Sequence, residues 1–138
     1  MREELEKKLI AKYPKIFCQV DLPPSKSLMC FGFECGDGWY DLIDRLCEYI
    51  QRMTDSNSNY KGGNWTQFEA VQVKEKFGTL RFYGSGGPPD SDLFFGAIEF
   101  AEFLSSKICE YCGKEGKLRG KGWLYTLCDK CWEEKQNG

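Results

Sequence analysis

Cys109-Glu-Tyr-Cys112 and Cys128-Asp-Lys-Cys131 are two Cys-x-x-Cys pairs separated by fifteen residues, and they decide how the end of this chain folds. Two residues between ligands allow both sulfurs of a pair to reach one ion at about 2.3 Å, and two such pairs are typical of a tetrahedral zinc site. Gly113 follows the first pair, where a metal-binding turn often needs a positive φ. Because four thiolates leave no coordination position for a water nucleophile, the spacing predicts a structural Zn²⁺ bound by Cys109, Cys112, Cys128 and Cys131.

The residues between the two pairs have the pattern of a short β-hairpin. Segments 117–119 and 123–127 flank a glycine-bearing turn, Gly120-Lys-Gly122. Together with the cysteines they predict a zinc ribbon over residues 108–138, joined to a core domain over residues 1–107. Zinc binding supplies on the order of 10 kcal/mol to such a module, which explains how so small a segment folds.

Two other interpretations of the cysteines are a pair of disulfides and a redox-active centre of thioredoxin type. Disulfides need an oxidising compartment, and residues 1–8 lack the apolar core of a signal peptide. We therefore expect a cytoplasmic protein. A thioredoxin-type motif occurs singly, whereas here a second pair follows at ribbon spacing, so the zinc site is favoured.

Composition restricts the classes of function. The chain of 138 residues is 15% aromatic, which indicates one well-supplied core. No apolar run approaches the roughly 20 residues that cross a bilayer, so no membrane association is expected. The net charge of −2, from 19 basic and 21 acidic side chains, disfavours indiscriminate binding to nucleic acid.

The sequence contains no histidine. This removes the usual general base at neutral pH, the Ser-His and Cys-His nucleophile pairs and every metal site that needs a histidine. No spacing of carboxylates, lysines or tyrosines argues for another catalytic centre. We therefore expect a non-enzymatic protein with no catalytic residues.

Periodicity in the rest of the chain predicts an α+β fold: a small antiparallel sheet packed with about three helices, followed by the zinc ribbon. The predicted helices are 2–13, 39–53 and 91–107. The predicted strands are 27–33, 68–74 and 80–83, with Gly78 at the positive-φ position of the last turn. The predicted loops are 54–66 and 84–90.

Helix 39–53 is the clearest amphipathic segment, and Asp37 is the predicted N-cap before it. Its predicted core face consists of Trp39, Leu42, Ile43, Leu46, Cys47 and Ile50. Its predicted solvent face carries Asp44 and the i,i+4 pairs Asp41–Arg45 and Glu48–Arg52.

Alternation and helical spacing also predict which side chains share a face in the hairpin and in helix 91–107. In the hairpin, Val71 and Val73 are expected on one face, with Ala70, Gln72 and Lys74 on the other. In helix 91–107 the predicted apolar face consists of Leu93, Ala97, Phe100, Ala101 and Leu104.

The hairpin is the first candidate binding site. Cations and an aromatic side chain are expected close together on it, namely Lys74, Lys76, Arg81 and Tyr83. In an otherwise acidic protein they predict a site for an anionic or nucleotide-like small molecule, with Trp39, Tyr40 or Tyr83 stacking on it. The alternative is an ordinary solvated sheet face.

The ribbon hairpin is the second candidate site. Basic and aromatic side chains are concentrated there, namely Lys114, Lys117, Arg119, Lys121 and Trp123. They fit nucleic-acid binding by phosphate contacts and base stacking. A third hypothesis is an adaptor that binds a host protein, in which zinc only braces a surface. Self-association is compatible with all three.

The remaining cysteines are Cys18, Cys30, Cys35 and Cys47. A second metal site is one interpretation. Cys47 falls on an apolar helix face, however, and free cysteine commonly behaves as a small buried hydrophobic residue.

Three segments resemble a family of small, functionally uncharacterised proteins of phages, prophages and bacteria: Gly38-Trp-Tyr-Asp-Leu-Ile-Asp-Arg-Leu46, Val73-Lys-Glu-Lys-Phe-Gly-Thr-Leu-Arg-Phe-Tyr83, and the C-terminal cysteine pairs. The resemblance covers roughly residues 36–132. It implies a mobile-element setting, in which small proteins are often counter-defence factors that bind a host protein or sequester a nucleotide signal.

Overall fold

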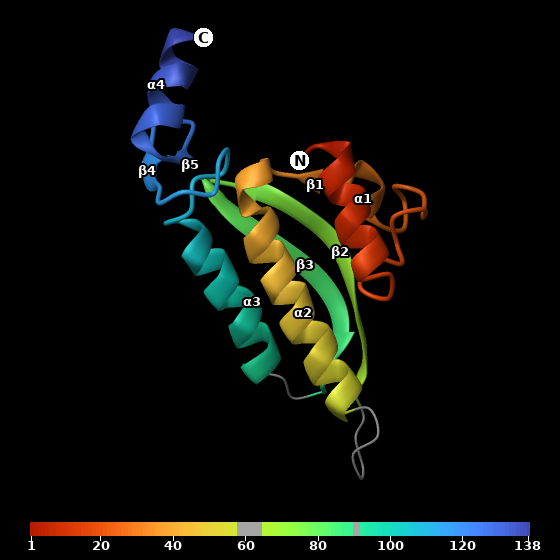
Figure 1. Cartoon of the computed structure of the whole chain (residues 1–138). Helices are drawn as coiled ribbons and strands as arrows, with labels where there is room; N and C mark the ends of the chain where they lie inside the picture. Colours follow the sequence, from red (N-terminus) through yellow and green to blue (C-terminus); the bar gives the residue numbers. More distant parts are fainter. Residues whose placement is uncertain (58–64, 90–91) are drawn as a thin grey trace.

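A computed structural model describes residues 1–57, 65–89 and 92–138. Its larger part is a three-stranded sheet in the order β1-β2-β3 with helices α2 and α3 side by side across one face (Figure 1). The C-terminal part is a two-stranded sheet, β4-β5, followed by α4, and it lies at the end of the larger sheet where β2 turns into β3 (Figure 1). The predicted α+β fold with a C-terminal ribbon-like module is confirmed.

The elements begin and end as follows: α1 Glu3–Lys12, β1 Phe33–Glu34, α2 Tyr40–Asn57, β2 Thr66–Lys76, β3 Thr79–Gly87, α3 Asp92–Ser105, β4 Lys117–Arg119, β5 Tyr125–Leu127 and α4 Asp129–Asn137. Residues 58–64 of the predicted loop 54–66, and Asp90 at the end of the predicted loop 84–90, lie outside the described residues.

The β2–β3 hairpin is tighter and longer than predicted. Phe77 (φ 54°) and Gly78 (φ 81°) form a two-residue turn with positive φ at both positions, which confirms the role of Gly78. Residues 84–87 continue β3, so the predicted loop at 84–90 is wrong over this stretch. The glycine at position 84 is needed there, because a Cβ would lie 2.6 Å from Cε1 of the Phe68 ring.

A β-bulge changes which residues of β2 face the core. Ala70 pairs with Gly84 and Gln72 with Tyr83, so Val71 has no partner of its own in the register. Ala70 and Val73 are therefore both buried, and the predicted alternation is wrong. One extra residue in a strand moves every later side chain to the opposite face of the sheet from the one that simple alternation predicts.

The predicted strand 27–33 is mostly a 3₁₀ helix, Leu28–Phe31. The Ser27 hydroxyl accepts a hydrogen bond from the Met29 amide (3.3 Å), and Gly32 at φ 69° ends the turn. Only Phe33–Glu34 is a strand, and it pairs in parallel with β2. The three-stranded sheet is thus mixed, where an antiparallel one was expected.

Helix α2 runs four residues beyond its predicted end at 53. Of the predicted core face, Ile43, Leu46, Cys47 and Ile50 are buried and Leu42 is partly buried. Trp39 is also buried, but it ends a 3₁₀ turn, Asp37–Trp39, just before α2. The predicted cap is wrong: the Asp37 carboxylate accepts hydrogen bonds from the backbone amide (2.7 Å) and Nε of Arg2.

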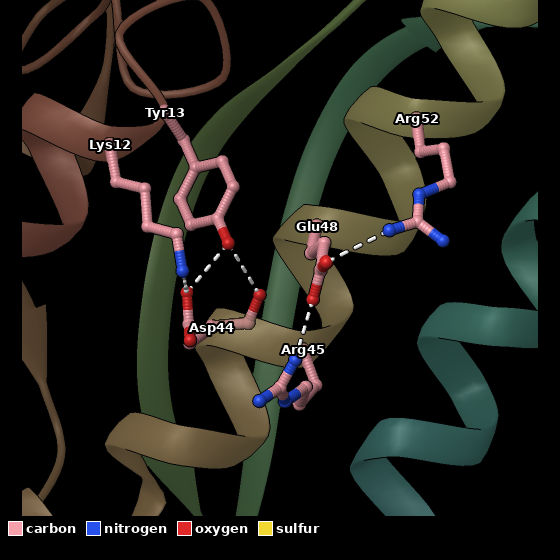
Figure 2. Close-up of polar contacts among 6 residues, drawn as sticks. All are labelled: Lys12, Tyr13, Asp44, Arg45, Glu48 and Arg52. Carbon is pink, nitrogen blue, oxygen red and sulfur yellow. Dashed lines mark hydrogen bonds and ion pairs between the residues drawn. The ribbon is translucent and has the colours of Figure 1, made fainter.

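Asp44, expected on the solvent face of α2, is only 9% exposed because the end of α1 covers it. Its carboxylate accepts hydrogen bonds from the Tyr13 hydroxyl (2.6 Å) and from Nζ of Lys12 (2.8 Å), as Figure 2 shows. Burial by itself would raise the pKa of Asp44, but these two donors outweigh it and hold the pKa below its usual value. The same contacts fix α1 to α2.

Beyond Asp44, Glu48 forms an ion-pair network on the surface of α2. Glu48 accepts from Arg45 (2.8 Å) and from Arg52 (3.0 Å), so both guanidinium groups converge on one carboxylate (Figure 2). The Glu48–Arg52 pair was predicted, whereas Arg45 was expected to pair with Asp41. Such exposed pairs contribute little to stability.

The face of α3 that packs on the core is rotated from the one predicted. Of the predicted residues, Ala101 is buried, Ala97 and Leu104 are half-buried and Phe100 is 61% exposed. Phe94 and Ile98, which were not predicted, are buried in the core. Two side chains of this helix also bind the outer edge of β3: the Ser105 hydroxyl accepts from the Leu80 amide (2.8 Å), and the Glu102 carboxylate accepts from the Phe82 amide (3.2 Å).

Candidate metal centre and adjoining pocket

The four cysteines of the two Cys-x-x-Cys pairs form one cluster. Their sulfur atoms all lie within 4.8 Å of one another, and Sγ of Cys112 is 3.7 Å from Sγ of Cys128. Metal–sulfur bonds of about 2.3 Å in a tetrahedron place the sulfurs about 3.8 Å apart, close to this distance. The cysteines are unpaired thiols. Cys109, Cys112, Cys128 and Cys131 together could hold a metal ion.

The first pair lies in a tight turn that closes on itself. The Gly113 amide donates to the Cys109 carbonyl (2.8 Å), and the Cys109 amide donates to the carbonyl of Lys114 (2.7 Å). Gly113 has φ 78°, as the metal-turn hypothesis requires. These bonds direct the sulfurs of the pair to the same side of the turn.

The second pair lies at the start of α4. Cys128 is the N-cap residue, and its sulfur accepts a hydrogen bond from the Cys131 amide (3.4 Å). This bond favours the thiolate and lowers the pKa of Cys128 to about 7. Burial raises the pKa of the Cys112 thiol. A cation that binds all four sulfurs would stabilise their deprotonated forms.

The first metal turn is bound directly to the core. The Glu110 carbonyl accepts from the Gly38 amide (2.7 Å), and its carboxylate accepts from the Gly36 amide (3.0 Å). The indole N–H of Trp39 donates to the Ile108 carbonyl (2.8 Å). Burial raises the pKa of Glu110. The loop before α2 thus holds the metal turn in place.

The ribbon hairpin packs against the turn between β2 and β3. Its second strand begins at Tyr125, two residues later than predicted. The buried Thr126 hydroxyl donates to the Gly78 carbonyl (2.6 Å). A Cβ on Gly78 would lie 2.5 Å from Cδ1 of Leu118, so the glycine also permits this close approach.

A pocket of about 390 Å³ lies at this junction. The β2–β3 hairpin contributes Lys74, Glu75, Lys76 and Phe77, and β1 contributes Glu34. The ribbon contributes the loop Gly122-Trp-Leu124. Residues of both candidate regions, the β2–β3 hairpin and the ribbon, therefore line one pocket, a point that the sequence left open.

Of the predicted ligand-binding residues on the hairpin, Lys74 and Lys76 line the pocket, whereas Arg81 and Tyr83 are not among the lining residues. Arg81 lies opposite Lys74 in the sheet and donates to the Thr79 hydroxyl (2.8 Å), and Tyr83 is exposed further along the same strand.

The aromatic residues at the start of α2 do not reach the pocket. Trp39 is completely buried and bonded to Ile108, and Tyr40 is half-buried against the core. Trp39 is a packing residue that joins the metal turn to the core, so it is not available for stacking on a ligand.

Of the predicted nucleic-acid-binding residues of the ribbon, two interact with other residues of the ribbon and three are exposed. Arg119 is bonded within the chain, to the Leu127 carbonyl (2.9 Å) and to Asp129, and Lys117 is 3.3 Å from the same carboxylate. Trp123, Lys121 and Lys114 are exposed.

Sequence reasoning did not select Phe77, Glu34 or Glu75 for the pocket. Phe77 is 66% exposed at a two-residue turn, and an aromatic residue before the glycine of a hairpin turn is a signal that could have identified it. Glu34 depends on the parallel pairing of β1, for which the sequence gives no signal. Glu75 is oriented by a hydrogen bond from the Gly78 amide (2.7 Å).

The remaining cysteines are dispersed. Cys35 and Cys47 are buried, and burial raises the pKa of both thiols. Cys18 is exposed and donates to the Glu69 carboxylate (2.9 Å), and Cys30 is exposed. Within the described residues, the ribbon cysteines are the one cluster found that could hold a metal, so no second metal site is found there.

Among the described helices, none has the length and apolar character required to cross a membrane. Comparison of the chain with family models, with curated proteins and with solved structures gave no significant match.

Proposed function

We propose that this protein is a non-enzymatic, zinc-stabilised binding protein whose ligand is an anionic, nucleotide-like small molecule. The observation that carries the proposal is the pocket where the β2–β3 turn meets the ribbon, because it brings Lys74, Lys76 and Phe77 of the hairpin together with Trp123 of the ribbon. Its volume of about 390 Å³ falls within the range of roughly 300–1,000 Å³ that is usual for small-molecule sites.

The lining suits a molecule with both phosphate and base. Lys74 and Lys76 offer ammonium groups to phosphate oxygens. Trp123 is 69% exposed and offers a ring face for stacking. Phe77 is 66% exposed, and Nζ of Lys76 lies over its ring, 5.5 Å from the centroid, so a cation and an aromatic ring stand together at the turn. The Glu34 carboxylate accepts hydrogen bonds from N–H donors, such as those on the edge of a purine. The combination favours a nucleotide over a bare phosphate ion.

Zinc is the metal that we assign to the cysteine cluster, since four thiolates in tetrahedral arrangement are the ligands of structural zinc. Its role is to hold the ribbon, and with it the loop that carries Trp123, against the hairpin. In a mobile-element setting, a pocket of this kind would act by sequestering a nucleotide signal of the host.

The proposal is tested by isothermal titration calorimetry of the zinc-loaded protein with ATP, and with inorganic phosphate for comparison. We expect ATP to bind more tightly than phosphate, and the Lys74→Ala/Lys76→Ala variant to lose at least about tenfold in affinity, since each lost charged hydrogen bond costs roughly 1.5–3 kcal/mol. Lys26→Ala, which removes an exposed lysine that does not line the pocket, is the control. Unchanged affinity in the double variant, or no binding of ATP, would contradict the proposal.

A second candidate function is single-stranded nucleic-acid binding by the ribbon loop. The observation that favours it is the 69% exposure of Trp123 next to the exposed Lys121. Fluorescence anisotropy of a labelled oligothymidine at several salt concentrations distinguishes the two functions. Lys121→Ala should weaken oligonucleotide binding and reduce its salt dependence, but should leave ATP binding unchanged, because Lys121 does not line the pocket.

A further inference from the structure

The face of the β2–β3 hairpin that points away from the core carries two cations directly opposite each other. Lys74 is the partner of Arg81 in the register of the two strands. The neighbouring pair, Val73 and Phe82, is buried in the core, so Lys74 and Arg81 lie on the other face of the sheet. Like charges at directly opposite positions destabilise a sheet. An anion bound by both side chains would remove this cost.

Arg81 also differs from the other arginines of the chain. Each of the other four forms an ion pair with a carboxylate: Arg2, Arg45, Arg52 and Arg119. Among the described residues, Arg81 has no such partner, and neither has Lys74 or Lys76. Glu34 is next to Lys74 in the register of the sheet, but the two side chains are not ion-paired. Three cations on one face of the hairpin thus lack a carboxylate partner within the described chain.

The Arg81 guanidinium is held toward the turn of the hairpin. Its Nη1 donates to the Thr79 hydroxyl (2.8 Å) and to the Leu80 carbonyl (3.2 Å). The Thr79 hydroxyl in turn donates to the carbonyl of Lys76, the residue opposite it in the register (3.3 Å). Nε and Nη2 of Arg81 make no hydrogen bond to a described residue, so this edge of the guanidinium is free to donate to two oxygens of one anion. It lies toward the end of the hairpin where Lys74 and Lys76 line the pocket.

We propose that the ligand of the pocket is a nucleoside triphosphate and that Arg81 binds its outer phosphates, next to those bound by Lys74 and Lys76. The three cations and Thr79 form one patch of four residues, two on each strand. The phosphates of a triphosphate are contiguous, so their combined negative charge matches so compact a patch. The phosphates of an oligonucleotide are separated by sugars and do not match it. This inference rests on the proposed function and adds the polyphosphate chain and the residue that recognises it.

The test is isothermal titration calorimetry of the zinc-loaded full chain with ATP, ADP, AMP and inorganic triphosphate. We expect the wild type to bind ATP at least about tenfold more tightly than AMP. Arg81→Gln should lower the affinity for ATP at least about tenfold and the affinity for AMP less than about twofold, because the charged hydrogen bonds of Arg81 are made to the outer phosphates. Arg52→Gln, which removes an exposed arginine that does not line the pocket, is the matched control and should leave both affinities unchanged.

Two further measurements separate ligand binding from a structural role. Because Arg81 lies opposite a like charge, Arg81→Gln should not lower the free energy of unfolding in urea when no ligand is present. Thr79→Val removes the hydroxyl that orients the guanidinium and should reduce the preference for ATP over AMP, whereas Thr79→Ser should retain it.

Equal affinities of the wild type for ATP and AMP, an undiminished affinity of Arg81→Gln for ATP, or a loss of its stability without ligand would overturn this inference and leave the nucleotide pocket in place. Binding of inorganic triphosphate as tightly as ATP would contradict the nucleotide specificity of the proposed function and support the phosphate contacts inferred here. Absence of binding to all four probes would overturn both.

Discussion

Gly38→Ala is the substitution with which the contact between the core and the metal turn can be tested most directly. Gly38 lies where the loop before α2 meets the first metal turn, and its amide donates to the Glu110 carbonyl (2.7 Å). A Cβ at this position would overlap the Cys109 carbonyl oxygen and would lie 2.6 Å from the Gly113 nitrogen. All of these are backbone atoms, so no side-chain rotation relieves the clash.

The expected cost follows from the contacts that must break. Moving the metal turn away from the loop removes the Gly38–Glu110 bond and the bond from Gly36 to the Glu110 carboxylate. Each bond contributes about 1 kcal/mol, and an amide left buried without an acceptor costs about 1–3 kcal/mol. We therefore expect Gly38→Ala to lower the free energy of unfolding by about 3–5 kcal/mol, a large part of the 5–15 kcal/mol typical of a domain.

Urea denaturation of the zinc-loaded protein, followed by circular dichroism, measures this loss, and competition with a chromophoric chelator measures zinc affinity in parallel. Gly96→Ala is the matched control, because a Cβ there meets nothing within 4 Å and alanine is favoured in a helix interior by about 0.5–1 kcal/mol. A Gly38→Ala variant whose free energy of unfolding lies within about 0.5 kcal/mol of the wild type, with equal zinc affinity, would show that the close contact at Gly38 does not stabilise the metal turn.

Other predictions concern single contacts. Asp44→Ala should cost about 1–2 kcal/mol in urea denaturation, because the Tyr13 hydroxyl keeps the Asp44 carbonyl as an acceptor. Because folding lowers the pKa of Asp44, its carboxylate stabilises the folded state above the unfolded pKa of about 4, and this stabilisation is lost as the pH falls through the folded pKa. Asp44→Asn should therefore make the free energy of unfolding depend less on pH in the acid range. Cys112→Ser should release zinc to a chelator that leaves the wild type loaded, measured by elemental analysis. Thr126→Val should remove the donor to the Gly78 carbonyl and weaken ATP binding in calorimetry, whereas Thr126→Ser should retain most of the affinity.

The features that sequence reasoning predicted are those set by local spacing. The cysteine pairs predicted the cluster because two-residue gaps constrain sulfur positions almost by themselves. Gly78 predicted the hairpin turn because positive φ selects glycine. The core face of α2 followed from a clean 3.6-residue period from Trp39 to Ile50.

The features that it missed depend on contacts between distant parts of the chain. The bulge at Val71 exists because β2 pairs with Gly84 on one side of it and Tyr83 on the other, and alternation alone cannot show such a shift. Asp44 is buried because Lys12 and Tyr13 at the end of α1 cover it, and the periodicity of α2 alone placed it in solvent. Helix α3 has large apolar residues on its exposed as well as its buried sides, so apolar spacing gives only a weak signal for which side turns inward.

In the candidate pocket, too, the residue types could be predicted from the sequence, but the contact between distant segments could not. Lys74, Lys76 and Trp123 were each singled out for their residue type, but the sequence could not show that the hairpin and the ribbon meet. That meeting depends on the Thr126–Gly78 hydrogen bond and on the hydrogen bonds of Glu110 to the loop before α2, which join residues far apart in the chain.

The side chains that α3 places along β3 have a consequence for the behaviour of the protein at high concentration. The outward amides of Leu80 and Phe82 are already bonded to Ser105 and Glu102, so an extended peptide that approaches this edge finds neither amide free. Templated addition of strands, the common first step toward fibrils, is thereby blocked at the centre of β3. The hydrogen bonds from α3 thus protect this edge together with the charge of Arg81, which lies between the two amides.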